Sequence, residues 1–263
     1  MLGPKYISEP GDLSTGKIWL DSGLWMSIIP SQMSAGTLYL VSTPIGNLSD
    51  MSFRAIEILK SVSIIAAEDT RHTGLLLAHY GIKNQLTSYH DFNKNSRAPQ
   101  LIEELMAGKS VAVVCDAGTP GISDPAYLLV NLASKNDIEI VPIPGPTAFV
   151  AALTVSGLPT DRFVYEGFLP VKSGKRAKRL QLLKDESRTM IFYESPYRVL
   201  KTLDAMYEIL GDRRVSFSRE LTKKFEETKR GKISELKEQL QGKSIKGEFV
   251  LVVAGKAEES GSE

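Results

Sequence analysis

Short apolar runs that alternate with helix-like segments are the feature that most limits how this 263-residue chain can fold. In the first half, the strand-like runs cover residues 37–42, 63–67, 110–115 and 138–141, and apolar residues recur at helical spacing between them. Apolar strands that alternate with helices are typical of a parallel sheet covered on both faces. The first half of the chain therefore predicts an α/β fold.

Three of these strands run into loops rich in glycine and proline, at residues 44–47, 117–121 and 144–147. Loops at the carboxyl ends of parallel strands are where α/β proteins bind ligands. Because such turns are common in this fold class, they predict a ligand site without naming the ligand.

A break at residues 157–161 precedes a second α/β unit, which we expect to contain a mixed sheet. Residues 1–35 show no sustained periodicity and no secretory segment, so we interpret them as a poorly ordered extension. The predicted organisation is an extension (1–35), an N-terminal α/β domain (36–157), a C-terminal α/β domain (158–256) and a disordered tail (257–263).

The composition excludes several classes of protein. No run approaches the roughly 18 apolar residues of a membrane span, so we expect no membrane partner. The single cysteine, Cys115, cannot form an internal disulfide or a cysteine metal site, and a buried strand position is its expected role. The three histidines are not spaced like metal ligands. We therefore expect a cytoplasmic protein without a metal.

Positive charge gathers in the second half of the chain. Residues 1–145 contain 10 Lys and Arg against 14 Asp and Glu, whereas residues 146–263 contain 22 against 17. The densest basic run, at 172–179, includes Lys175, Arg176, Lys178 and Arg179. Two interpretations remain open, a solvated helix face and a strip that faces phosphates.

Two charged clusters have the composition of functional sites. Glu68 and Asp69 follow a strand, where a carboxylate could accept a proton or hold a ribose hydroxyl, or could cap a helix. Residues 218–231 surround Phe225 with charges of both signs. That segment is either a solvated helix with ion pairs or a set of phosphate-positioning cations with Phe225 as a stacking or packing group.

Seven motifs in one order resemble a branch of the tetrapyrrole-methylase family across residues 36–256. They lie at residues 40–48, 67–71, 116–125, 142–148, 192–196, 219–227 and 246–248. The branch methylates the ribose 2′-hydroxyl of a cytidine in 16S ribosomal RNA of the small subunit. The resemblance implies two α/β domains with S-adenosylmethionine in the cleft between them, in a homodimer.

The resemblance also implies roles for residues at the matching positions. The expected cofactor contacts are Pro44, Ala117, Gly118, Thr119, Ile122, Thr147 and Ala148. Small residues let the backbone approach such a ligand, and Ile122 offers an apolar wall.

For the reaction, Glu68 or Asp69 is the candidate for handling the hydroxyl, and Arg71 with Arg198 for positioning charge. Lys223 and Glu226 are the candidates for the wall on the substrate side, and Lys223 and Lys224 are expected to face phosphates.

Two single positions and the looser segment 89–93 depart from the family pattern, and two other functions stay open. Ala126 replaces a usual glycine at an expected helix start, and Tyr197 replaces a usual histidine where substrate contacts could change. A methylase acting on a small tetrapyrrole should lack the basic run and the Lys223 cluster. A non-catalytic RNA-binding module should lack intact cofactor loops.

Overall fold

The computed structural model describes residues 17–20, 24–27, 35–242 and 245–256. Within the extension, β1 (Lys17–Leu20) pairs with β2 (Leu24–Ser27) in antiparallel fashion. The rest of the predicted extension and the tail at 257–263 lie outside the described residues.

The first unit is a five-stranded sheet in the order β5-β4-β6-β3-β7, and all of its strand pairs are parallel. Its strands are β3 (Leu38–Val41), β4 (Ile64–Ala67), β5 (Leu86–Ser88), β6 (Val111–Val114) and β7 (Ile140–Ile143). Its helices are α1 (Phe53–Ser61), α2 (Thr70–His79), α3 (Lys94–Met106) and α4 (Ala126–Lys135), with a 3₁₀ turn, η1, at Leu48–Asp50. The α/β expectation for this half is confirmed.

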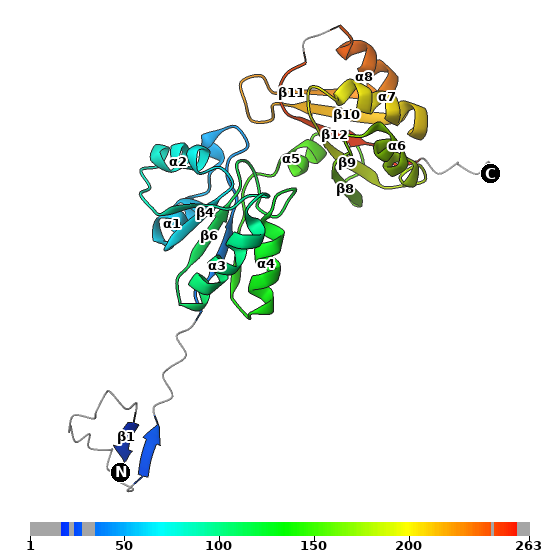
Figure 1. Ribbon diagram of the computed structural model, residues 1–263. Coiled ribbons are helices and arrows are strands. Elements are labelled where there is room, and N and C mark those ends of the chain that lie inside the picture. The colour runs from blue at the N-terminus through cyan, green and yellow to red at the C-terminus, as the bar shows by residue number, and fades with distance from the viewer. Residues whose placement is uncertain (1–16, 21–23, 28–34, 243–244, 257–263) are drawn as a thin grey trace, which may run out of the picture.

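The alternation of buried residues along β6 explains the two helical layers of the first unit. Val111 and Val113 pack in the cluster that holds α3 and α4, whereas Ala112 and Val114 pack in the cluster that holds α1 and α2. Successive side chains of a strand point to opposite faces, so each face of the sheet is covered by one helical pair. Figure 1 shows these helices on the two sides of the sheet.

Element boundaries differ from the sequence expectation at two prolines. The strand expected at 138–141 is observed as β7, two residues later, and includes Pro142. Because β7 is an edge strand, the missing N–H of Pro142 is tolerated there. The helix expected from Ala98 begins at Lys94, so Pro99 lies in the second turn of α3, where its missing N–H removes one backbone hydrogen bond of the helix.

The second unit is a mixed sheet in the order β11-β10-β12-β9-β8, with only β8 and β9 parallel. Its strands are β8 (Phe163–Phe168), β9 (Thr189–Glu194), β10 (Arg214–Arg219), β11 (Glu227–Lys232) and β12 (Phe249–Val253). α6 (Ser173–Leu182), α7 (Val199–Leu210) and α8 (Ile233–Leu240) cover one face, and α5 (Ala148–Thr154) covers the other. The mixed sheet is as expected.

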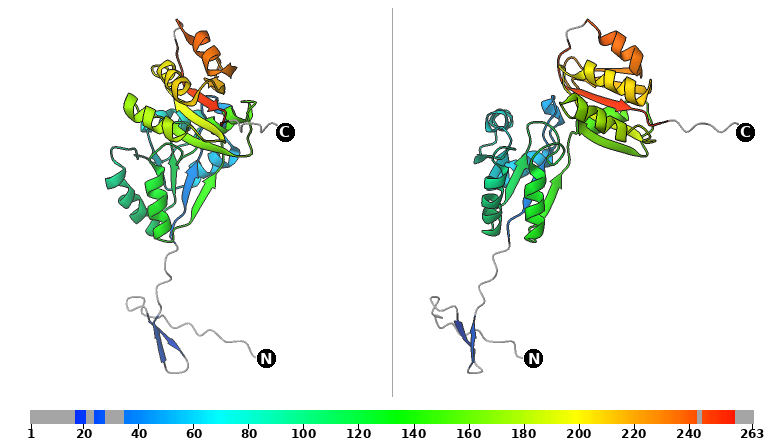
Figure 2. Two further views of the ribbon diagram at one scale, coloured as in Figure 1. Left: turned by 90° about the vertical axis from the view of Figure 1, so that its right-hand side faces the viewer. Right: turned by 45° about the vertical axis from the view of Figure 1, so that its right-hand side comes forward.

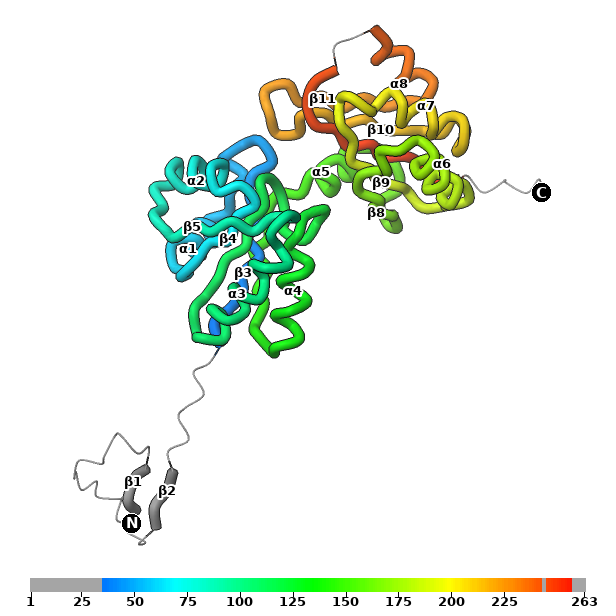
Figure 3. The backbone as a smooth tube through the Cα atoms, viewed as in Figure 1, coloured from blue at the N-terminus to red at the C-terminus, as the bar shows by residue number. Residues whose placement is uncertain are grey.

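α5 joins the two units but packs with the second. Its Ala152 and Leu153 share a buried cluster with Ile191, Val250 and Val252 of the second sheet. Figure 3 traces the chain from the first unit through α5 into the second, and the right view of Figure 2 shows the two units separately. The boundary at residue 158 stays a prediction, and the packing of α5 favours a position nearer to residue 147.

The segment between β10 and β11 is a turn. Glu220 and Thr222 have φ values of 51° and 66°, which a right-handed helix does not contain. The alternative of a solvated helix over residues 218–231 is therefore wrong.

Candidate functional site

A cavity of about 440 Å³ opens at the carboxyl edge of the parallel sheet, where the two units meet. One wall comes from the ends of β4 and β6 and from the loops after β3, β6 and β7. The other wall comes from the ends of β8 and β9, the β10–β11 turn and the start of β12. The lining residues are 45, 68, 115–119, 122–124, 147–148, 168, 193–196, 221 and 247–250.

The cavity lies at the topological switch point of the parallel sheet. From β3 the chain passes to β4 beyond β6, whereas from β6 it reaches β7 beyond β3. Open α/β sheets bind ligands at such a point. The loops after β3 and β6 are joined at this point, because Thr43 donates its N–H to the Gly118 carbonyl (2.8 Å) and its own carbonyl accepts the Gly118 N–H (3.1 Å). Gly118 has a φ of 94°, a conformation that favours glycine.

The hydroxyl of Thr119 ties three loops together. It donates to the carbonyl of Pro146 at 3.2 Å and lies 3.0 Å from the hydroxyl of Ser42 and 2.7 Å from that of Thr147. Donation to Pro146 leaves the oxygen lone pairs of Thr119 for the other two hydroxyls. The loops after β3, β6 and β7 are thus held in fixed positions around the cavity.

Most residues expected to contact a cofactor lie in this wall. The expected residues that line the cavity are Ala117, Gly118, Thr119, Ile122, Thr147 and Ala148. Pro44 is buried next to the wall, and its neighbour Ile45 lines the cavity instead.

Glu68 and Asp69 have different positions. Asp69 caps α2, accepts the N–H of Arg71 at 2.8 Å and pairs with the Arg71 guanidinium at 2.7 Å, which holds the pKa of Asp69 well below its usual range. Glu68 lines the cavity, and burial raises its pKa. The helix-cap interpretation therefore applies to Asp69, and Glu68 is the carboxylate that faces the cavity.

Asp116 links these two residues to the next loop. Its N–H donates to Glu68 Oε2 at 3.3 Å, and its Oδ1 accepts the N–H of Asp69 at 3.0 Å. The ends of the neighbouring strands β4 and β6 are thereby fixed, which sets the direction of the Glu68 carboxylate.

Asp124 closes the loop after β6. Its carboxylate accepts the N–H of Gly121 at 2.7 Å and the N–H of Ala126 at 2.8 Å, while burial raises its pKa. Ala126 is the first residue of α4 and is buried, so alanine fits at this departure from the family pattern.

Arg71 and Arg198 do not occupy similar positions. The side chain of Arg71 is 90% exposed, pairs with Asp69 and is absent from the cavity wall. Arg198 lies just behind the wall, 2.6 Å from the carboxylate of Glu194, and donates to the carbonyl of Leu169 at 3.2 Å.

Glu194 is a wall residue to which the sequence analysis gave no role. It ends β9, is buried, and accepts the hydroxyl of Thr202 at 2.6 Å as well as the Arg198 guanidinium. The sequence signal that could have identified Glu194 was its position at the end of a strand, four residues before Arg198.

Lys223 connects the second unit to the first. Its ammonium lies 2.9 Å from Glu248, a wall residue, and 3.1 Å from Glu220. Partial burial opposes its charge, but these hydrogen bonds outweigh that effect and raise its pKa. Its stem lies against Gly46, where a Cβ would come within 2.4 Å of Lys223 Cγ. Glu226 lies outside the wall and accepts the N–H of Thr222 at 2.5 Å.

Aromatic rings cover the cavity on the side of the second unit. Tyr193 and Phe168 both line it, with ring centroids 5.5 Å apart, and Tyr165 lies 5.4 Å from Tyr193. The hydroxyl of Tyr165 is 2.7 Å from that of Ser123, so a hydrogen bond crosses between the units. The signal for these rings was weak, because their convergence depends on how the units pack.

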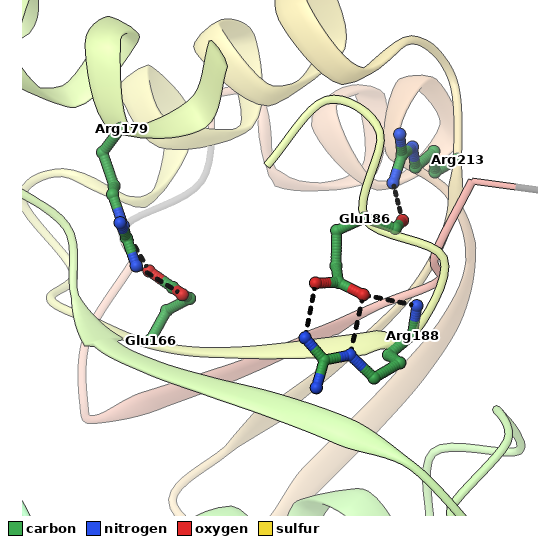
Figure 4. A network of polar contacts seen from close by, with 5 residues as sticks. All are labelled: Glu166, Arg179, Glu186, Arg188 and Arg213. Carbon is green, nitrogen blue, oxygen red and sulfur yellow. Dashed lines mark hydrogen bonds and ion pairs between the residues drawn. The ribbon is translucent and has the colours of Figure 1, made fainter. Parts of the chain in front are cut away.

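The basic run lies on α6, and its four expected cations separate into two groups. Arg176 is only 8% exposed and donates to the carbonyl of Val171 at 3.3 Å, so its assignment to phosphates is wrong. Arg179 forms a two-bond pair with Glu166 at 2.7 and 2.8 Å (Figure 4). Lys175 and Lys178 are exposed.

A second polar network in Figure 4 fixes the loop before β9. Glu186 pairs with Arg188 at 2.8 Å, and Arg213 donates to the Glu186 carbonyl at 3.4 Å. These contacts are structural, because none of the three residues lines the cavity.

The cavity wall is acidic. In the described part of the chain it holds five carboxylates and no lysine, arginine or histidine; the five are Glu68, Asp116, Asp124, Glu194 and Glu248. Burial also raises the pKa of the nearby Cys115 thiol to about 12, so that thiol is not a nucleophile at neutral pH. Among the described residues, no group of three or more His, Cys, Asp or Glu is arranged to hold a metal ion.

A family model described as tetrapyrrole (corrin/porphyrin) methylases matches residues 37–237, most of both units. The chain belongs to this family. The two α/β units and the cavity between them are therefore those of a member of the tetrapyrrole-methylase family.

Curated relatives within this family are about half identical to the chain. A protein of Halalkalibacterium halodurans is 52% identical over 85% of this chain and 77% of its own length. One of Synechocystis is 52% identical over 84% and 79%, and one of Escherichia coli O157:H7 is 49% identical over 86% and 80%. All three are named ribosomal RNA small subunit methyltransferase I.

Solved structures of two methyltransferases share the fold. A cobalt precorrin-4 methyltransferase has a TM-score of 0.61 at 16% identity, covering 85% of this chain and 95% of its own. The uroporphyrin-III C-methyltransferase of Thermus thermophilus, complexed with S-adenosyl homocysteine, has a TM-score of 0.59 at 17% identity, covering 83% and 97%. The two-domain tetrapyrrole-methylase architecture is therefore confirmed.

None of the helices that the structure describes is both long and apolar enough to cross a bilayer.

Proposed function

We propose that this protein transfers a methyl group from S-adenosylmethionine to the ribose 2′-hydroxyl of a cytidine in the 16S RNA of the small ribosomal subunit. The observation that carries the proposal is about 50% identity, over most of the chain, to relatives named ribosomal RNA small subunit methyltransferase I. The cavity at the switch point supplies a place for the reaction.

The wall has the chemistry that S-adenosylmethionine requires. Gly118 and Ala117 bring backbone close to the ligand, Ile45 and Ile122 offer apolar surface, and the carboxylates favour a cation. Bound there, the cofactor supplies a methyl group that its positively charged sulfur already activates. The protein is left to align the acceptor and to receive its proton.

Glu68 is the residue that we assign to receive that proton. A ribose hydroxyl is a poor nucleophile, so a carboxylate within reach of the acceptor assists its attack. Glu68 faces the cavity, burial raises its pKa, and the N–H of Asp116 orients it. Asp69 is committed to capping α2 and to Arg71, which favours Glu68 of the two.

On the opposite side, Arg198 and Lys223 are positioning residues. Glu194 holds Arg198 behind the wall, and Glu248 holds Lys223 at the mouth beside Gly46. Both cations are thereby fixed beside the cavity without entering it. Arg71 and Glu226 keep supporting roles at the edges of the two units.

Mapping of ribose methylation tests the proposal directly. Small-subunit RNA from cells with and without the gene is compared, and the purified protein is then supplied with S-adenosylmethionine and RNA or assembled subunits. One cytidine should lose its 2′-O-methyl group in the deletion strain and regain it with the protein. Unchanged ribose methylation, together with methyl transfer to a tetrapyrrole, would assign the protein to the small-molecule branch of the family.

Binding to this RNA is expected to weaken steeply with salt, since neutralised phosphates release counterions. Lys224 and Lys178 are exposed cations on the second unit, whereas Lys223 is held by Glu220 and Glu248. Replacing Lys223 and Lys224 by alanine should flatten the slope of log K against log salt by about one unit for each phosphate that the variant no longer neutralises.

Filter binding at several salt concentrations measures that slope. Lys135→Ala, in the last turn of α4, is the matched control. Equal slopes for the Lys223/Lys224 variant and the control would remove the phosphate assignment of this turn.

We further assign the protein to the cytoplasm, where small subunits are made, and to a homodimer, which the family resemblance implies. Sedimentation velocity on the full chain measures the second assignment.

Deleting residues 1–35 should leave methyl transfer and the melting temperature nearly unchanged. The family match begins at residue 37, and Gly36, which donates its N–H to the Leu105 carbonyl at 2.7 Å, is kept. Thermal melts and initial rates of both proteins measure the effect. A large loss of either would assign the extension a place on the folded core.

A further inference from the structure

The cavity has a rim of exposed aromatic rings where β8 and β9 end. The two strands are parallel neighbours, with Phe168 opposite Tyr193, so their carboxyl ends lie at one edge of the sheet. Phe168 ends β8, lines the cavity and is 56% exposed. Tyr197 is 91% exposed and follows Ser195 and Pro196, which line the cavity as well.

The backbone that carries Tyr197 is fixed although its ring is free. Glu194 accepts the N–H of Ser195 at 2.8 Å and binds the Arg198 guanidinium, and the N–H of Arg198 returns to the Ser195 carbonyl at 3.1 Å. Across the described residues, the Tyr197 ring contacts no other aromatic ring and its hydroxyl has no hydrogen-bond partner. The turn therefore presents an exposed aromatic ring on a fixed backbone.

Two exposed lysines follow one of these rings, Phe168, in the sequence. β8 runs through Val171 into α6, so Lys172 and Lys175 follow Phe168 closely along the chain, and both are exposed. Neither takes part in an ion pair within the described residues, whereas Arg176 and Arg179 of the same helix are engaged by Val171 and Glu166. Free cations beside exposed rings are typical of surfaces that bind single-stranded nucleic acid.

The charge of the cavity supports the same arrangement. Its wall holds five carboxylates and, within the described chain, no basic residue. Two of these carboxylates are already paired with cations, Glu194 with Arg198 and Glu248 with Lys223, so the described part of the wall offers a phosphate no free cation. Lys172 and Lys175 are exposed cations outside the cavity wall, which gives the flanking phosphates a place to bind.

We infer that Phe168, Lys172, Lys175 and Tyr197, here called the β8–β9 rim, bind unpaired RNA beside the target nucleotide. The bases stack on the two rings and the phosphates contact the two lysines. The inference rests on the proposed function and adds a property of the substrate. The target must lie in a single-stranded segment whose bases are splayed out, because bases inside a duplex have no free face.

Equilibrium binding of a fluorescein-labelled oligocytidine, alone or paired with oligoguanosine, tests the inference on the full-length protein. The single strand should bind more tightly than the duplex. Tyr197→Leu and Phe168→Leu should each weaken single-strand binding roughly 5- to 150-fold, the range seen when one stacking ring is removed. Tyr197→Trp should retain the affinity, because it keeps a stacking face.

Salt dependence separates the two kinds of interaction. The leucine variants should lose affinity at every salt concentration with an unchanged slope, whereas Lys172→Ala/Lys175→Ala should flatten it by about one unit per phosphate that the lysines neutralise. Phe163→Leu is the matched control, since Phe163 starts β8 at the opposite end from Phe168 and is 39% exposed. Phe163→Leu should bind the single strand as tightly as the wild type does. All variants should bind S-adenosylhomocysteine with wild-type affinity except Phe168→Leu, because Phe168 lines the cavity.

Wild-type affinity in Tyr197→Leu, or equal affinity of the wild type for single strand and duplex, would overturn the inference. If the wild-type protein methylates small-subunit RNA while Tyr197→Leu behaves as the control does, the rim assignment fails and the proposed function stands. If the wild-type protein neither methylates nor binds RNA, both fail together.

Discussion

Gly118→Val is expected to weaken S-adenosylmethionine binding by about 100-fold, since forcing methyl groups into a packed site costs up to roughly 3 kcal/mol. A Cβ at this position would lie 3.5 Å from Ile45 Cγ2 and 3.7 Å from the Pro146 carbonyl oxygen, already in contact with two loops of the cavity. The two additional methyl groups of valine must then extend into the cavity or displace those loops. Titration calorimetry measures the loss.

Gly121→Val is the matched control for backbone strain. Gly121 has a φ of 92°, close to the 94° of Gly118, but a Cβ there would meet no atom within 4 Å. Both variants should therefore melt a few degrees lower, because a side chain in the left-handed region costs roughly 1–2 kcal/mol. Only Gly118→Val should lose the cofactor. If the two folded variants bound the cofactor with equal affinity, the cofactor site would not be at this loop.

β5, with the sequence Leu-Thr-Ser, is short and partly polar, and the periodicity of the sequence did not predict it. The other four strands of the first sheet were predictable because they are apolar on both faces and three of them lead into loops rich in glycine and proline. The loop after β6, residues 115–125, could be recognised as a ligand loop for the same reason. The boundary of the second unit was harder to predict. α5 has the pattern of any short apolar helix, and only tertiary packing assigns it to Val250 and Val252.

Side-chain roles were predictable only where the local sequence decides them. Glu68 and Asp69 are adjacent acids, and the sequence does not distinguish their roles. Their roles differ because Asp69 is at the N-cap of α2, whereas Glu68 faces the loop after β6. In the basic run, the helical period places Arg176 on the buried face with Leu180, a distinction that overall charge does not make. Glu248 and Phe168 reach the cavity from the second unit, so no local pattern could place them there.

The largest effect on the reaction is expected from Glu68→Gln. Removing a general base typically lowers the rate 10²- to 10⁴-fold, and the amide keeps the size of the side chain and an acceptor for the Asp116 N–H. The affinity for S-adenosylmethionine should change little, so the loss should appear in kcat. Asp69→Asn is the comparison, because asparagine keeps an oxygen that can cap α2 and the lost pair is with the exposed Arg71. This variant should change both the rate and the melting temperature little.

Ionisation of Glu68 as the pH rises should increase the rate of methyl transfer but lower the stability of the folded protein. Burial raises its pKa in the folded protein, so the folded state holds this proton more tightly than the unfolded chain, and ionisation as pH rises opposes folding. Glu68→Gln should therefore be at least as stable as the wild type at neutral pH although it is nearly inactive.

The wild-type rate should fall on the acidic side at a pH above the value of about 4.3 that is usual for glutamate. Rate profiles and thermal melts from pH 4.5 to 8 measure both quantities. A Glu68→Gln variant that keeps the wild-type rate and acidic limb would assign the proton to another group, with Asp124 the next carboxylate of the wall whose pKa burial raises.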